Sequence, residues 1–206
     1  MRTVRIISAR GIVSALAAAL FATPPVALAD PAATRPPLIA LAATTASALA
    51  LRSSDFAPGG AVAPACVYGG WGCHGGNASP ALSWNHPPAG TRSFAVLLFD
   101  PDAPRGFWHW AVFDIPVVVT SLRAGAGDPA RHLLPTGAIQ VRNDWGAMGY
   151  GGPCPPPGRP HHYRLRLYAL SVAKLGLGAG ASAAQVAAKV EANALAQAEI
   201  IGLYGR

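Results

Sequence analysis

Glycine and proline recur too often in this chain for a fold built on long helices. Its 206 residues include 23 glycines and 20 prolines, about a fifth of the chain where roughly 12% is average. Charged residues make up only 12%, whereas a coiled coil carries Glu and Lys at many surface positions. Hydrophobic residues reach 51%, which is enough to bury a core and argues against intrinsic disorder. The length suits one domain, with or without a tail.

The first thirty residues have the three parts of a secretory signal peptide. Arg2, Arg5 and Arg10 form a positive region, an uncharged apolar run covers 11–22, and Ala-Leu-Ala at 27–29 is a cleavage site of small residues. We therefore predict that residues 1–29 are a signal peptide. The alternative is an uncleaved membrane anchor, but an apolar run of about 12 residues is short for a membrane span.

Removal of that segment leaves a weakly basic chain. Three arginines and no acidic residue are lost, so the formal charge falls from +7 to +4. A charge this small, without a basic run, does not indicate a nucleic-acid partner. No later hydrophobic stretch approaches the roughly 18 residues of a membrane helix. We expect a periplasmic or secreted protein with no membrane span.

Three cysteines remain in the exported chain. They are Cys66, Cys73 and Cys154, and an oxidising compartment favours their pairing. One disulfide is possible with one thiol left over, and this count alone leaves all three pairings open. The spacing matches no CxxC pattern, so we expect no zinc site built on these residues.

Apolar runs between turn residues predict a β-rich domain. Residues 30–45 are rich in Ala, Pro and Thr and predict a flexible tail, which is followed by one domain over 46–206. Successive side chains of a strand point to opposite faces, which places His109 on the opposite face from both Trp108 and Trp110. Strands are expected over 46–51, 93–99, 108–115 and 162–170.

The C-terminal part carries a helical pattern instead. Ser182 and Gln185 fit a capping box, and Val186 and Val190 begin a repeat of apolar residues at every fourth position. We predict a helix of about 20 residues from Ala183. Several strands followed by one late helix favour a mainly β fold over alternating β-α units.

The few polar side chains gather at three places. Asp100 and Asp102 follow a predicted buried strand, with prolines around them, and form either the rim of a pocket or an ordinary turn. His109 lies among aromatic residues, where it is either a ligand-binding residue or a hydrogen-bonded core histidine. A stiff loop rich in Gly and Pro, residues 151–158, leads into His-His-Tyr at 161–163. The alternative for this loop is a plain surface linker.

Taken in order, these motifs resemble the phosphatidylethanolamine-binding protein family, in particular its bacterial YbhB/YbcL type, often called Raf-kinase-inhibitor-like. The order is Asp-Pro-Asp-Ala-Pro at 100–104, a His in an aromatic strand, the Gly/Pro loop and then His-x-Tyr at 161–163. Residues 77–84 are similar to the family's N-x-SP-x-L-x-W stretch, and residues 143–146 to the lead-in to its PCPP loop. The resemblance covers roughly residues 48–206.

The resemblance implies a fold and a site. The fold is mainly β, a two-sheet antiparallel Greek-key β-sandwich with a C-terminal α-helix. The site is a small preformed pocket that binds anions. Its expected residues are Asp100, His109, Pro155, Pro156, His161 and Tyr163, with Asp102 and Trp108 at the rim.

Two further expectations come from the same resemblance. Secreted relatives suggest Cys73–Cys154 as the disulfide, which leaves Cys66 as the odd thiol. Where bacterial relatives usually carry a His in the final helix, this chain has Asn193. That departure puts a contribution of the helix to the pocket in doubt and leaves the main site unaffected.

The leading function implied is binding, without catalysis, metal or cofactor. The pocket would hold a phosphate-like group of a phospholipid head group, a phosphopeptide or a small anion. Phosphate needs donors such as His N–H and Tyr O–H, and an Asp beside them serves best by accepting from a His N–H and fixing its tautomer. The alternatives are a secreted inhibitor of a kinase or protease, and a metal-assisted hydrolase, although no G-x-S-x-G nucleophile motif occurs.

The signal peptide gives the first testable prediction. Protein isolated from its native compartment should begin near Asp30, because cleavage follows the small residues at 27–29. Intact-mass spectrometry measures this directly. A full-length cytoplasmic product would contradict it.

Overall fold

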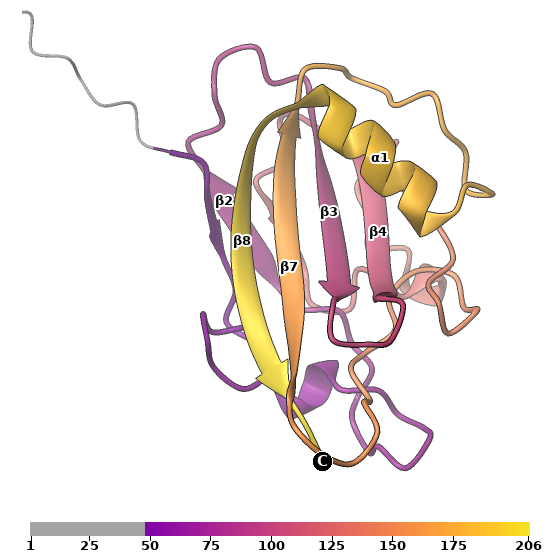
Figure 1. The fold of residues 1–206 in the computed structure, drawn as a ribbon. Helices are drawn as coiled ribbons and strands as arrows, with labels where there is room; N and C mark the ends of the chain where they lie inside the picture. Colours follow the sequence, from indigo (N-terminus) through magenta and orange to yellow (C-terminus); the bar gives the residue numbers. More distant parts are fainter. Residues whose placement is uncertain (1–47) are drawn as a thin grey trace, which may run out of the picture. The chain divides into compact units, whose positions relative to one another are not determined.

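Two antiparallel sheets and one α-helix make up the described part of the chain, residues 48–206, in the computed structural model (Figure 1). The small sheet has the order β1-β2-β5, formed by Ala50–Arg52, Leu82–Asn85 and Ser121–Leu122. The large sheet has the order β6-β4-β3-β7-β8, formed by Ile139–Gln140, Phe107–Pro116, Ser93–Asp100, His161–Leu170 and Ala194–Tyr204. Two short 3₁₀ helices cover Pro64–Cys66 and Pro129–Arg131.

The fold confirms the mainly β class, the two antiparallel sheets and a single α-helix, α1 (Ala183–Asn193). The Greek-key connection pattern stays a prediction. The signal peptide over 1–29 and the tail over 30–45 lie outside the described residues. Within residues 48–206, no helix is long and apolar enough to cross a membrane.

Apolar residues on both faces of the central strands require cover on both sides of the large sheet. Phe94, Val96 and Leu98 of β3 belong to the core that also contains the small sheet's apolar residues. Ala95 and Leu97, on the opposite face, pack in a second core with α1, which lies in front of the large sheet in Figure 1. Burial of each large aliphatic or Phe side chain stabilises the fold by roughly 1.5–3 kcal/mol.

The predicted strands lie in the right places, and their ends differ by a few residues. The runs at 93–99, 108–115 and 162–170 correspond to β3, β4 and β7, each slightly longer than predicted. β1 is shorter, because it begins at Ala50. β2, β5 and β6 are short strands of two to four residues, and no clear pattern marked them.

The predicted helix of about 20 residues is wrong in its second half. α1 begins after the capping box of Ser182 and Gln185 but ends at Asn193, and the following residues form β8. Residues spaced four apart also satisfy a period of two, so this apolar pattern fits a strand as well as a helix. The strand prevails because β8 pairs with β7 along its whole length and places Ile200 in the core.

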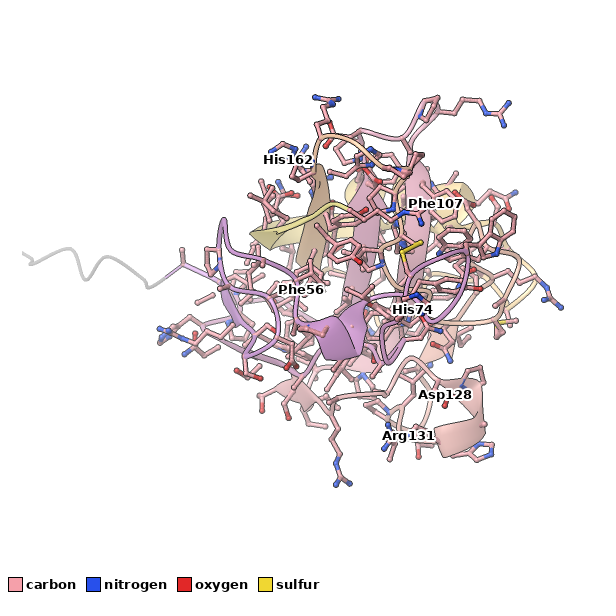
Figure 2. All side chains as sticks on the ribbon, turned by 90° about the horizontal axis from the view of Figure 1, so that it is seen from below. Phe56, His74, Phe107, Asp128, Arg131 and His162 are labelled. Carbon is pink, nitrogen blue, oxygen red and sulfur yellow. A yellow bond between two sulfur atoms is a disulfide. The ribbon has the colours of Figure 1, made fainter. Side chains whose placement is uncertain are left out.

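A disulfide joins Cys73 to Cys154, with Cα atoms 6.0 Å apart; it is the yellow bond in Figure 2. The two segments it links also share a backbone hydrogen bond, from Tyr68 N–H to Pro153 O at 3.0 Å. The third cysteine, Cys66, is free and buried. Burial raises the pKa of its thiol to about 12, so this thiol is neutral at pH 7.

We expect loss of the disulfide to lower the free energy of unfolding by about 4 kcal/mol, because the bridge restricts a long loop in the unfolded chain. The loop spans 81 residues. The Cys73→Ala/Cys154→Ala double variant, unfolded with urea, measures this loss. Dithiothreitol should produce the same loss in the wild type and no further change in the variant. A loss below about 1 kcal/mol would show that the bridge does not hold the fold in this way.

Candidate functional site

A pocket of about 580 Å³ lies at one end of the large sheet. There β3 ends, β4 and β7 begin and the chain itself ends, at the lower edge in Figure 1. Figure 2 views the molecule from below, with Phe107 and His162 labelled at this end. The pocket brings together seven residues expected at the site, namely Asp100, Asp102, His109, Pro155, Pro156, His161 and Tyr163.

A hydrogen bond between the last residue of β3 and the first residue of β7 orients one histidine of the pocket. His161 Nδ1–H donates to Asp100 Oδ2 at 2.7 Å. The other carboxylate oxygen of Asp100 accepts the backbone N–H of Asp102 at 2.8 Å, and Asp100 is buried. A carboxylate that accepts at Nδ1 fixes the tautomer of the ring. His161 Nε2 is thereby left for a ligand.

The second histidine of the pocket is held by a backbone carbonyl. His109 Nδ1 lies 2.6 Å from the carbonyl oxygen of Gly151, which can only accept, so Nδ1 carries the hydrogen. Burial lowers the pKa of His109 to about 4, and this effect outweighs the Gly151 hydrogen bond and the charges of Asp100 and Asp144, which act in the opposite direction. His109 is therefore neutral at pH 7, and its Nε2 is a hydrogen-bond acceptor.

Tyr163 contributes an unused hydroxyl. Its side chain is completely buried, and among the described residues its oxygen has no hydrogen-bond partner. Burial raises the pKa of Tyr163 far above its usual value, so the hydroxyl keeps its hydrogen. The ring packs edge-on against His109 with centroids 5.3 Å apart, and lies 6.4 Å from the ring of His161. Tyr163 and the two histidines line the same pocket, so an unused donor lies beside two imidazole rings.

Asp102 forms the rim of the pocket and links it to β7. Its carboxylate accepts the backbone N–H of His162 at 2.7 Å and the ring Nδ1–H at 2.8 Å. Arg159 lies 3.3 Å from the other oxygen. The hydrogen bonds from His162, first from its backbone and then from its ring, lower the pKa of Asp102. These bonds hold the loop after β3 in place.

Trp108 does not line the pocket, in contrast to the expectation. The pairing of β3 with β4 shifts register between Leu98, opposite Trp110, and Phe99, opposite Trp108. This β-bulge inserts an extra residue, His109, into β4 and reverses the alternation at that point. Trp108 therefore packs against Phe99 and the α1 side of the sheet. Trp110 lies in the inner core with the pocket residue Tyr163, so the prediction that His109 faces away from both tryptophans is wrong for Trp110.

Some pocket residues had no signal in the local sequence. Arg206, at the end of the chain, donates from Nε to the carbonyl oxygen of Pro155 at 2.7 Å. Trp145 donates from Nε1 to Gly152 O at 3.2 Å and stacks on Tyr68. Only the three-dimensional fold brings such distant segments together. The pocket residues not singled out beforehand include Trp71, Phe107, Trp145, Arg159 and Arg206.

The structure also shows where the helix lies relative to the pocket, and whether side chains of the metal-binding type cluster together. No residue of α1 lines the pocket, and the Asn193 side chain donates to the carbonyl oxygen of Lys189 within the helix. In the part of the chain that the structure describes, no group of three or more His, Cys, Asp or Glu side chains is arranged to hold a metal ion.

Comparison with known proteins leads to the same family as the motifs. The family model described as phosphatidylethanolamine-binding protein matches residues 52–205. The chain is 45% identical over 162 residues to YbcL of Escherichia coli K12, an alignment that covers 77% of this chain and 88% of YbcL. It is 38% identical over 156 residues to YbhB of the same organism, covering 75% of this chain and 98% of YbhB.

Solved structures agree with this result. The crystal structure of E. coli YbcL, described as a new member of the mammalian PEBP family, matches with a TM-score of 0.75 at 44% identity and covers 78% of this chain and 99% of YbcL. A PEBP homolog from Chlamydia trachomatis matches with a TM-score of 0.64 at 30% identity and covers 77% of this chain and 98% of that chain. The chain belongs to the phosphatidylethanolamine-binding protein family and resembles its YbcL/YbhB members.

Proposed function

We propose that this protein binds a phosphate-type anion in the pocket between His109, His161 and Tyr163. The observation that carries the proposal is the buried Tyr163 hydroxyl, which has no partner among the described residues. A buried polar group left without a partner costs roughly 1–3 kcal/mol, and a hydrogen bond to a charged acceptor contributes about 1.5–3 kcal/mol. An oxyanion in the pocket supplies that acceptor.

The charges around the pocket are compatible with an anion. Asp100 and Asp102 each accept from a histidine N–H group, which directs these carboxylates toward protein donors and offsets part of their negative charge. Arg206 lines the pocket and uses its Nε for Pro155. The other nitrogens of this guanidinium stay available as donors. Arg159 adds a second cation at the rim.

The walls of the pocket favour a ligand with an organic part. Its volume of about 580 Å³ falls within the range of small-molecule sites and leaves room beside a phosphate group. The walls are formed by Pro155, Pro156, Trp71, Phe107 and Trp145. The disulfide to Cys154 fixes one of these walls in advance, which reduces the entropy lost on binding. A phosphorylated head group, a phosphopeptide and a small anion all fit this description.

We propose binding rather than catalysis. The pocket holds no Ser, Thr or free Cys beside His161, since its single cysteine, Cys154, is disulfide-bonded. Nucleophilic catalysis needs such a group within hydrogen-bond reach of the base. Inhibition of a kinase or protease, which the resemblance also implies, has no specific feature of the structure in its favour.

We also propose that the protein is periplasmic or secreted. The disulfide supports this, because such bonds persist in oxidising compartments. A relative in Mycobacterium tuberculosis that is 37% identical over 164 residues is named as a lipoprotein, LppC.

Tyr163→Phe separates binding from folding. We expect it to weaken binding of inorganic phosphate about tenfold or more, because the variant loses a donor to a charged acceptor. Its melting temperature should stay the same or rise, because the hydroxyl that is removed has no partner in the protein. Titration calorimetry and thermal unfolding measure the two effects.

Tyr150→Phe is the matched control. The Tyr150 hydroxyl is buried outside the pocket and donates to Cys66 O at 2.7 Å, so its removal should lower stability by about 1 kcal/mol and leave phosphate affinity unchanged. Equal phosphate affinity in Tyr163→Phe and the wild type would contradict the proposed site.

A further inference from the structure

We propose that the pocket selects oxyanions that carry a hydrogen on one oxygen, namely hydrogen phosphate and phosphate monoesters in their singly protonated form, over sulfate and phosphate diesters. The inference rests on the proposed anion site and narrows its ligand class. It follows from the hydrogen-bonding role of His109, whose Nε2 accepts a hydrogen bond, whereas the Tyr163 hydroxyl donates one.

The tautomer of His109 is set by its surroundings. Its Nδ1 faces the carbonyl oxygen of Gly151 at 2.6 Å, and a carbonyl oxygen can only accept. Nδ1 therefore carries the hydrogen. In the neutral ring Nε2 is then a lone-pair acceptor, and among the described residues the hydrogen bond of the ring is the one made by Nδ1.

Burial keeps the ring neutral. His109 is only 2% exposed, and its pKa is lowered to about 4 by desolvation. No carboxylate bonds to the ring, because Asp100 accepts from His161 and from Asp102 N–H, and Asp144 accepts the backbone N–H of Trp108. The charged and titratable groups that surround His109 or share its pocket are Asp100, Asp102, Asp144, Arg159, His161, Tyr163 and Arg206.

One tetrahedral group can meet all three side chains, since the His109 and His161 rings lie 5.3 Å and 6.4 Å from the ring of Tyr163. Tyr163 donates a hydrogen bond to such a group, whereas His109 needs to receive one. A fully ionised oxyanion places a lone pair against the His109 lone pair. A protonated oxygen forms a hydrogen bond there instead, so a ligand with P–OH satisfies both Tyr163 and His109.

Inorganic phosphate and sulfate test the idea on the wild type. Both are tetrahedral anions, but phosphate keeps at least one hydrogen at neutral pH whereas sulfate has none. We expect phosphate to bind about tenfold tighter or more in titration calorimetry, which is the expected effect of one unsatisfied buried acceptor. Sulfate that binds as tightly as phosphate would overturn the inference.

Methyl phosphate provides an internal pH control. Its last hydrogen leaves at a pH of about 6, as in other phosphate monoesters, while inorganic phosphate remains protonated. The ratio of the inorganic phosphate affinity to the methyl phosphate affinity should be flat below about pH 6 and should rise above it by about tenfold or more in total, the same factor as between phosphate and sulfate. Titration of the protein's own groups cancels in this ratio. A ratio that stays flat up to about pH 8 would overturn the inference.

The variant His109→Asn removes the acceptor and retains the donor. An Asn amide nitrogen can occupy the place of Nδ1 and donate to Gly151, but Asn has no counterpart of Nε2. We expect the preference for phosphate over sulfate to fall below about threefold, from about tenfold. His86→Asn, the same change at an exposed histidine outside the pocket, should leave the preference intact. If His109→Asn does not fold, the pH dependence of the ratio of inorganic phosphate affinity to methyl phosphate affinity in the wild type tests the inference by itself.

Two diesters complete the set of probes. Dimethyl phosphate should bind at least about tenfold more weakly than inorganic phosphate, because it has no P–OH group. Glycerophosphoethanolamine, a diester with an ammonium group, should be equally weak. Tight binding of this diester alone would show that an ammonium N–H serves His109, and would overturn the inference. Absence of binding by all these anions would refute the proposed function itself, whereas equal binding of phosphate and sulfate would refute only this inference.

Discussion

The hydrogen bond between Asp100 and His161 joins two neighbouring strands where the large sheet ends. Asp100 is the last residue of β3 and His161 the first of β7, and the two strands pair side by side as far as Phe99 and Arg164, so both side chains lie at the same end of the sheet. The bond engages a buried carboxylate and turns the free nitrogen of His161 toward the pocket. Without it, Asp100 would be an unpaired charge in a nearly dry site, which is strongly destabilising.

Backbone groups and the disulfide hold much of the rest of the site. The Gly151 carbonyl fixes His109, and Gly152 packs so closely on the backbone of Cys66 that a Cβ there would lie 2.3 Å from its carbonyl oxygen. The disulfide and the proline-rich loop hold the facing wall. A pocket built in this way exists before the ligand arrives, so little conformational entropy is lost when an anion binds.

The central strands and the main pocket residues could be predicted from local sequence patterns. The features that depend on strand pairing, or on contacts between distant segments, could not. The strands β3, β4 and β7 are marked by apolar runs between Pro and Gly residues, and the order of motifs brought Asp100, His109, His161 and Tyr163 into one expected site. The start of β8 was mistaken for helix because its alanine spacing satisfies both periods. Trp108 was misplaced because a bulge, which depends on the pairing of two strands, reverses the alternation. Arg206 contacts the site from the end of the chain, and no local pattern contains that information.

The most direct test of the central claim is a crystal structure of the protein grown with inorganic phosphate. The account predicts one phosphate in the pocket, with its oxygens within hydrogen-bond distance of Tyr163 Oη and of Nε2 of both His109 and His161. A phosphate found only on surface arginines such as Arg164 and Arg166, with none beside the Tyr163 hydroxyl, would contradict it.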